Sequence, residues 1–414
     1  MAVKTDISSK NIFFYLKGDK VIWAIAALLA IFSFIPVYSS SSNLAYLYGD
    51  GSTFSYLLNH FAYLVLGFIL IYAIHKIPYH YFKGLSLILL PIIVVLLLYT
   101  LAQGTTIDGA NASRWIKIPI INKTFQTSTA AAVVLMIYVA RYLSKIKDRT
   151  VTFKETIFPL WVPVGIILGL ILPANFSTTA IIFAMVFVLV FLGGYPLKYL
   201  GVILLSAIII LSIFVLSAKA FPGVFPNRVD TWISRIDNFS NGEDTKEDYQ
   251  IERAKIAIAR GGIVGTGIGK SVQRNFLPQS SSDFIYAIIV EEMGLLGAFG
   301  VMLAYLLILF RLVIIATKAN TVFGQLLVIG VGLPIIFQAL INMAVAVELF
   351  PVTGQTLPLV SSGGSSIWMT CVALGIVQSV SAKREEMKLK EEEDQERENR
   401  EDLDNPLEVL SEAI

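Results

Sequence analysis

The sequence predicts an all-α polytopic membrane protein with about ten transmembrane helices. Of the 414 residues, 56% are hydrophobic and 15% are charged, whereas soluble globular domains carry about 25% charged residues. Apolar runs of roughly 20 residues, the length that crosses a hydrocarbon core, recur along most of the chain. The net charge of +2 gives no indication of nucleic acid as a partner. The single cysteine, Cys371, excludes an internal disulfide.

The apolar runs define the expected spans in order. No small-residue cleavage site accompanies the first run, so we expect it to be retained as a span and not removed as a signal peptide. The expected spans are 20–39, 56–75, 84–102, 125–143, 157–172, 176–193, 198–217, 284–310, 322–346 and 364–382.

Lysine and arginine predict how these spans are oriented. They precede the first span and occupy the loops that follow the second, fourth, sixth and eighth spans, whereas loop 40–55 has none. Because cytoplasmic loops are enriched in these residues, we expect both termini to be cytoplasmic. The segments 103–124, 218–283 and 347–363 then face outward.

The chain divides into two parts. Residues 1–382 are expected to form the membrane domain, with a large outer loop at 218–283 between spans seven and eight. Residues 383–414 carry thirteen acidic and six basic residues, which predicts an acidic cytoplasmic tail. This composition favours a solubilising tail, a short solvated helix that becomes disordered, and a partner-docking tail is the alternative.

The stretch before span eight carries candidate functional residues. Five glycines lie between positions 261 and 269, but a nucleotide phosphate loop requires a glycine where Val264 stands. We therefore expect the glycines to allow close backbone packing or tight turns. Asp283 follows, where a water-facing loop meets an apolar span. It can cap the helix or serve catalysis or ligand binding, and the two roles are compatible.

Two carboxylates lie inside span eight. Glu291 and Glu292 are eight and nine residues beyond Asp283, which is about 12 Å along a helix. Charge inside a span is costly and indicates function by default. The alternative is a structural hydrogen bond between helices. His60, His75 and His80 are scattered and pair with no cysteine, so no metal site is expected from them.

Several motifs occur in a fixed order at matching topological places. They are Arg114, Trp115 and Ile116; Tyr249 and Gln250, then Ala257, Ile258, Gly261 and Gly262; Leu277 and Pro278; Asp283, Phe284 and Ile285; Glu291, Glu292 and Gly294; Pro351, Thr353 and Gly354; Leu357 and Pro358; and Ser361 or Ser362 with Gly363, Gly364 and Ser365. This set resembles the SEDS family (shape, elongation, division and sporulation) from the first span to about Ser381.

The chain departs from the family pattern at two places. Span four of the family begins Gln-Pro-Ser-Glu with a lysine three residues later, whereas this chain has Gln126, Thr127, Ser128, Thr129 and then Ala132. The turn between spans five and six is Pro-Asp-x-Gly in the family, and here it runs from Pro173 to Phe176. Roles of those family charges are not carried over.

The resemblance implies an activity and its residues. SEDS proteins are peptidoglycan glycosyltransferases that polymerise lipid II outside the bacterial cytoplasmic (inner) membrane, which makes Asp283 the expected general base. Neutralisation of the departing pyrophosphate is expected from Arg114, Lys255 or Arg260, or from a divalent cation, Mg²⁺ or Mn²⁺. Arg114 is favoured because a family motif contains it. The substrate-binding residues implied by the motifs also include Pro278, Glu291, Ser362, Gly363 and Gly364.

The resemblance also implies partners. SEDS proteins work with a class B penicillin-binding protein, and the acidic tail and the run from Gly354 to Gly364 favour the division branch (FtsW), with divisome proteins as further partners. An elongation-branch (RodA) polymerase is the alternative within the family. A lipid II flippase, which carries out no chemistry, and a scaffold that activates its partner are the alternatives outside it.

Overall fold

The computed structural model describes residues 16–48, 53–104, 114–118, 123–147, 149–220, 246–277 and 280–404. The described elements are α1 (Lys20–Tyr48), α2 (Thr53–Ile74), α3 (Tyr81–Gln103), β1 (Trp115–Ile118), β2 (Lys123–Gln126), α4 (Thr127–Ile146), α5 (Phe153–Thr156), the π-helical turn η2 (Ile157–Trp161), α6 (Val162–Ile171), α7 (Phe176–Leu192), α8 (Leu197–Ala220), α10 (Lys246–Gly261), the 3₁₀ turn η3 (Gln273–Asn275), α11 (Ile285–Thr317), α12 (Val322–Ala346) and α13 (Gly364–Asp404).

The expected all-α polytopic fold is confirmed. Among the described residues, nine helical segments are long and apolar enough to cross a membrane, and α5, η2 and α6 together make one of them. The remaining expected span, 176–193, is occupied by α7, a shorter apolar helix of 17 residues. The two strands, β1 and β2, pair antiparallel. β1 begins directly after Arg114, and β2 ends directly before α4.

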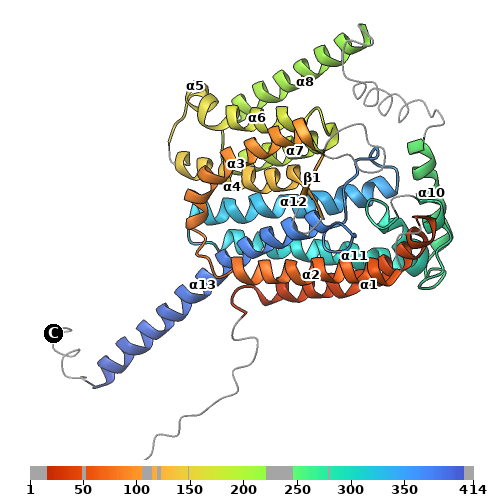
Figure 1. Ribbon diagram of the computed structural model, residues 1–414. Helices are drawn as coiled ribbons and strands as arrows, with labels where there is room; N and C mark the ends of the chain where they lie inside the picture. Colours follow the sequence, from red (N-terminus) through yellow and green to blue (C-terminus); the bar gives the residue numbers. More distant parts are fainter. Residues whose placement is uncertain are drawn as a thin grey trace, which may run out of the picture.

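The helices form one bundle in which α4, α12 and α13 are the most buried spans (Figure 1). The helix α8 is the least buried and reaches away from the bundle. The helix α13 packs along α2 and then continues beyond the bundle as a single helix. At the α2–α13 contact, a Cβ on Gly67 would lie 2.7 Å from Cys371 Sγ, so the two helices approach closely because that position has no side chain.

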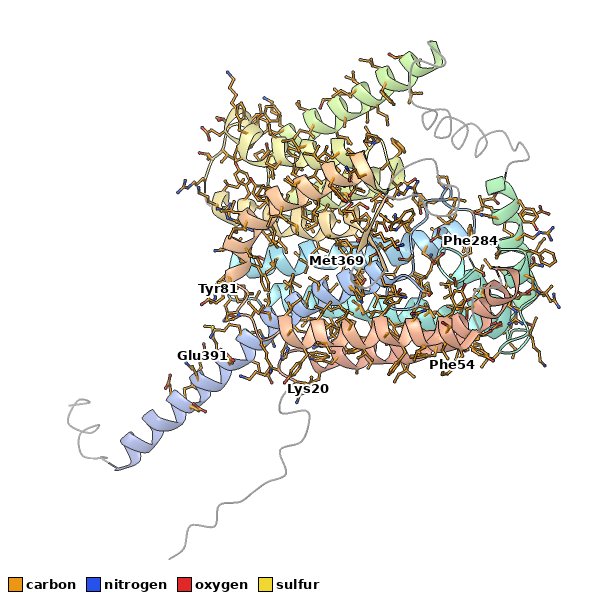
Figure 2. All side chains as sticks on the ribbon, viewed as in Figure 1. Lys20, Phe54, Tyr81, Phe284, Met369 and Glu391 are labelled. Atoms are coloured by element: carbon orange, nitrogen blue, oxygen red, sulfur yellow. The ribbon has the colours of Figure 1, made fainter. Side chains whose placement is uncertain are left out.

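The start of α1 and the later part of α13 meet at one end of the bundle. Figure 2 places Lys20, Tyr81 and Glu391 toward one end and Phe54 and Phe284 toward the other. At the first end, the Asp19 backbone N–H donates to Gln378 Oε1 at 2.7 Å, and Gln378 Nε2 donates to Asp19 O at 2.9 Å. The buried Asp19 carboxylate also pairs with Arg311. The start of α1 and the exit of α13 are therefore joined on one side, as an even number of spans predicts.

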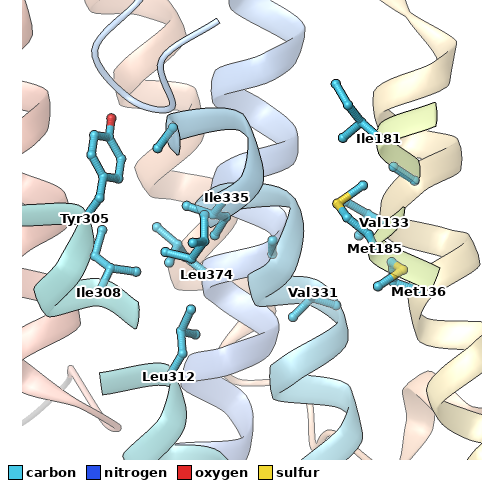
Figure 3. Packing of buried hydrophobic residues seen from close by; sticks show 14 of the residues in the cluster. Val133, Met136, Ile181, Met185, Tyr305, Ile308, Leu312, Val331, Ile335 and Leu374 are labelled. Atoms are coloured by element: carbon cyan, nitrogen blue, oxygen red, sulfur yellow. The ribbon is translucent and has the colours of Figure 1, made fainter. Parts of the chain in front are cut away.

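The central core is built mainly from α4, α7, α11 and α12. Figure 3 shows Met136, Met185, Val331 and Leu312 among the buried side chains that fill the space between these helices. Burial of such side chains, with close packing, stabilises the arrangement. This packing holds α12 beside α11. The candidate site lies at the N-terminal end of α11 and the C-terminal end of α12.

The helix α11 is interrupted at Gly294, which has φ 66° and ψ −165°. The polar backbone groups at this break bond to the glycine-rich segment that follows α10. Leu295 N donates to Gly262 O at 3.0 Å, and Gly267 N donates to Glu292 O at 3.0 Å. Irregular backbone inside a membrane protein is tolerated where other protein groups satisfy it, and residues 262–267 do so here.

Glycine is required where these two segments touch. A Cβ on Gly261 would lie 2.0 Å from Val290 O, one on Gly265 would lie 2.2 Å from Glu292 O, and one on Gly294 would lie 2.3 Å from Ile263 O. The expectation that the glycines allow close backbone packing is confirmed. They contact α11 around Gly294, which lies nine residues into that helix, about 13 Å from its start, and the expected water-facing position of this loop stays a prediction. We call residues 262–277 the hairpin segment.

Candidate active site

Asp283 lies immediately before α11. The expectation that it caps this helix is wrong: the cap position is Phe284, and no side-chain cap hydrogen bond is present there. The helix begins later than the apolar run indicated, because residues 280–284 form turns that face the segment between α12 and α13. The Asp283 carboxylate is therefore available for another role.

Two irregular segments are tied together around Asp283. Ser362 N donates to Ser281 O at 2.9 Å, and Ser361 Oγ donates to Ser282 O at 2.6 Å. Asn342 Nδ2 donates to Asp283 O at 2.7 Å. These bonds join the backbone on the N-terminal side of α11 to α12 and to the start of α13, so three helices position Asp283.

The surroundings of the Asp283 carboxyl raise its pKa from the usual 3.8 to about 6. Burial is the main cause, because it penalises the charged form. A hydrogen bond with Ser282 and the positive charge of Arg114 act in the opposite direction. Arg114 is itself oriented by a hydrogen bond from its Nε to Ala174 O at 3.0 Å.

A cavity of about 780 Å³ opens beside this site. Its walls come mainly from α7, α12 and residues 349–353, and most of them are apolar. Among the described lining residues Arg114 alone is charged, and Thr353 lies next to Gly354, where an added Cβ would be 3.5 Å from Asp283 Oδ2. The described lining consists of Arg114, Asn175, Phe176, Ser177, Ala180, Ile181, Ala184, Tyr286, Met302, Phe337, Leu340, Ile341, Met343, Ala344, Val347, Leu349, Phe350, Pro351, Val352 and Thr353. The cavity thus offers a long apolar surface with one cationic end near a carboxylate.

The structure brings Arg114 to Asp283 but places the other two predicted cations elsewhere. Lys255 pairs with the exposed Glu348 at 2.6 Å, and Arg260 Nη1 lies 3.9 Å from Glu291 Oε1. Neither residue belongs to the cavity lining. Pro278 lies outside the described residues. A substrate contact by these three residues stays a prediction.

Glu291 and Glu292 are buried, and their hydrogen bonds hold the hairpin segment. Glu291 accepts from Ser271 Oγ and, at 3.0 Å, from Val272 N. Glu292 accepts from Ser39 Oγ of α1 and, at 3.3 Å, from Ser271 N. These bonds favour the structural interpretation of the two carboxylates. Glu291 does not line the cavity, so its predicted contact with substrate has no geometric support.

The predicted run from Ser362 to Gly364 shapes the site through its backbone. Ser362 bonds Ser281 as described, and α13 begins at Gly364. A Cβ on Gly364 would lie 3.0 Å from the Tyr63 ring of α2, and one on Gly363 would lie 3.3 Å from Thr356 Cγ2. The glycines therefore allow close packing behind Asp283, and a direct substrate contact by this run stays a prediction.

The two departures from the family pattern are accommodated by neutral hydrogen bonds. Thr127 Oγ1 lies 3.0 Å from Thr100 Oγ1 of α3 at the start of α4. Asn175 caps α7 by accepting from Thr178 N at 3.2 Å. The turn before Asn175 also supplies the carbonyl of Ala174 that binds Arg114, so the altered turn still contributes to the site.

Asn342 is a site residue that the sequence argument missed, and Asn175 and Thr353 entered that argument without a role in the site. Asn342 lies in the last turns of α12, Asn175 is the N-cap of α7, and Thr353 lies in the irregular segment that follows α12. The available signal was a polar side chain within or next to an apolar span, which is costly unless it has a role.

Among the described residues, no three His, Cys, Asp or Glu side chains lie together as a protein-built metal site would need. The carboxylate that a cation at this site would meet is that of Asp283. Mg²⁺ usually binds through one or two carboxylates together with substrate phosphates, so this geometry fits a cation that is held largely by substrate oxygens.

Comparison with known proteins agrees with this architecture. The family profile described as "Cell cycle protein", of FtsW, RodA and SpoVE, matches residues 19–386. The chain is 32% identical to the probable peptidoglycan glycosyltransferase FtsW of Nitrosococcus halophilus, over 78% of this chain and 82% of that protein. It is also 32% identical to the protein of the same name from Hydrogenovibrio crunogenus, over 86% of this chain and 90% of that one.

Solved structures share the fold. A chain from a peptidoglycan synthase complex, studied for its coordination of polymerization and crosslinking, aligns with a TM-score of 0.67 at 24% identity over 89% of this chain and 98% of that chain. The rod shape determining protein RodA of Thermus thermophilus aligns with a TM-score of 0.63 at 23% identity, over 90% of this chain and 99% of that chain. The similarity to SEDS proteins that the motifs indicated is thereby confirmed, and the chain belongs to the FtsW, RodA and SpoVE family of cell cycle proteins.

Proposed function

We propose that this chain is a peptidoglycan glycosyltransferase of the FtsW type, which polymerises lipid II with Asp283 as general base. The observation that carries the proposal is the placement of Asp283 close enough to Arg114 to feel its charge, with Arg114 lining the polar end of a large apolar cavity. The curated relatives named FtsW support the reaction class and the division branch.

The cavity suits a substrate that is half lipid and half charged headgroup. Apolar walls from α7 and α12 accept hydrocarbon, because burial of apolar surface is favourable. Arg114, at the charged end, presents a planar guanidinium that can bind a pyrophosphate oxygen pair in a fork. In this arrangement the leaving group sits near Arg114 and the reacting sugar carbon faces Asp283.

The proposed reaction needs a base and a stabilised leaving group. The 4-hydroxyl of the acceptor sugar attacks the anomeric carbon of the donor, Asp283 takes the hydroxyl proton, and the carbon–oxygen bond to undecaprenyl pyrophosphate breaks. A carboxyl with a pKa of about 6 is mostly ionised at neutral pH, yet it binds a proton more readily than an ordinary aspartate. Mg²⁺ or Mn²⁺ is proposed to enter, where the reaction uses it, with the pyrophosphate.

The cellular setting is proposed on the same grounds. The chain resides in the bacterial inner membrane with both termini cytoplasmic, and Asp283 faces the outer side, where glycan strands grow. A class B penicillin-binding protein is the proposed crosslinking partner, in line with the coordination of polymerization and crosslinking described for the structural neighbour. Divisome proteins are proposed as further partners.

The decisive experiment compares Asp283→Asn with wild type in a lipid II polymerisation assay, alone and with the penicillin-binding partner. We expect Asp283→Asn to fold and to lose about 100-fold or more of the rate, the contribution of a general base. The matched control is Glu252→Gln, a carboxylate on the exposed face of α10, which should keep wild-type activity. A stable Asp283→Asn protein with near-normal glycan chain lengths would contradict the proposal. Movement of lipid II across vesicles by a protein that forms no glycan would instead establish a flippase.

A further inference from the structure

We propose that Asn342 of α12 is a positioning residue that fixes the base Asp283 and the wall of the site opposite it. This inference rests on the proposed function, because it assigns to Asn342 an effect exerted through Asp283. Asn342 is 1% exposed and lies one turn from the outer end of α12.

The amide of Asn342 joins two segments that have no regular structure of their own. Its Nδ2 donates at 2.7 Å to Asp283 O and at 2.7 Å to Gln355 O. Both partners are carbonyl oxygens, which only accept, so the nitrogen of the amide must face them. Both N–H groups are thus used to link the backbone before α11 to the backbone before α13.

The second contact matters as much as the first. Gln355 follows Gly354, and a Cβ on Gly354 would lie 3.5 Å from Asp283 Oδ2. The segment held by the second bond therefore forms the wall against which the Asp283 carboxylate rests. One side chain sets the backbone of the base and the position of its neighbour at once.

The other ties in this region do not replace Asn342. The bonds from Ser361 and Ser362 reach the carbonyls of Ser282 and Ser281, which precede the base. The hydrogen bond that holds the backbone carbonyl of Asp283 itself is the one donated by Asn342. Without it, two half-buried carbonyls lose their donor, and the cost of a desolvated polar group without a partner favours local rearrangement.

The arrangement of atoms on Asn342 is consistent with a donor role. Its Oδ1 has no hydrogen-bond partner among the described residues. Every hydrogen bond that the amide makes is therefore one that it donates. The isosteric replacement Asn342→Asp removes this pair and keeps the shape.

The test measures the polymerisation rate of Asn342→Leu and Asn342→Asp with purified protein and lipid II. Misplacement of a catalytic group by about 1 Å lowers the rate by about 100-fold, so we expect kcat to fall by about 10- to 100-fold. KM should stay within about twofold, because Arg114 and the part of the cavity wall that α7 provides are expected to keep their positions. The midpoint of the acid limb of the pH–rate profile should also move, because the distance from Asp283 to Arg114 changes. The matched control is Asn320→Leu, at the opposite end of the bundle, where Asn320 donates to Met387 Sδ.

A double variant separates positioning from an independent effect. If Asn342 acts through Asp283, adding Asn342→Leu to Asp283→Asn should lower the residual rate by less than about twofold, because groups acting as a unit are not additive. An equal loss in both backgrounds, or a normal kcat in Asn342→Leu, would overturn the assignment. Failure of both Asn342 variants to fold, shown by melting and size-exclusion profiles, would overturn it too, since the residue would then serve the fold as a whole. Activity in Asp283→Asn, by contrast, would remove the proposed base itself.

Discussion

Gly265 provides a test of how the hairpin segment and α11 fit together. A Cβ at this position would lie 2.2 Å from Glu292 O and 2.5 Å from its carbonyl carbon. The neighbouring Gly262 has φ 53° and open space at its Cβ position. Alanine at either site must adopt a positive φ, whereas alanine at Gly265 must also displace backbone.

These two terms give different expected losses of stability. Left-handed backbone costs an alanine about 1–2 kcal/mol, and this is the whole cost expected for Gly262→Ala. Overpacking adds about 1–3 kcal/mol, so Gly265→Ala should lose about 2–5 kcal/mol in total. At about 2 °C per kcal/mol for a large domain, the melting temperature of Gly265→Ala should lie about 2–6 °C below that of Gly262→Ala.

The assay is thermal unfolding of both variants in the same detergent, with folded yield from size-exclusion chromatography as a second measurement. Equal melting temperatures for Gly262→Ala and Gly265→Ala would refute the argument, because the contact with Glu292 would then impose no constraint. ATP should stabilise neither variant nor wild type. A melting shift on addition of ATP at micromolar concentration would show that the glycines bind nucleotide.

Two further predictions concern the chemistry of the site. The polymerisation rate should fall by about tenfold per pH unit below about pH 6, because the base acts as the carboxylate and its pKa is about 6. Arg114→Gln should move the midpoint of this pH profile upward, because the guanidinium lowers the pKa of Asp283. A rate independent of pH between 5 and 7 would argue against Asp283 as the base. Arg114→Lys should lower kcat/KM by about tenfold, because an ammonium cannot reproduce the two-pronged contact, and full activity in this variant would leave only a generic positive charge.

The helical fold was predictable because a span must be long and apolar, and this requirement is visible in local sequence. The expected spans 322–346 and 364–382 begin at the first residues of α12 and α13. The hairpin segment was not predictable in the same way. Its glycines resemble a loop until Gly294 interrupts α11 and creates backbone groups for them to bond, which is a long-range effect.

The candidate site was predictable in part. Arg114 and Asp283 are far apart in the chain, and only family motifs indicated that they act together. Lys255 and Arg260 were chosen for their charge, and each pairs with a carboxylate and does not belong to the cavity lining. The role of Asn342 could not be predicted because its two acceptors are backbone carbonyls. The pattern of side chains in a sequence does not indicate where a backbone carbonyl will lie.

The contact between α13 and α2 has a consequence for biosynthesis. During translation α2 enters the membrane long before α13 is made. The surface around Gly67, which α13 later covers, must therefore contact lipid or the insertion machinery until then. The backbone that ties down Asp283 through Ser361 and Ser362 arrives equally late. A nascent chain is therefore unable to complete the contacts around Asp283 until α13 has been inserted.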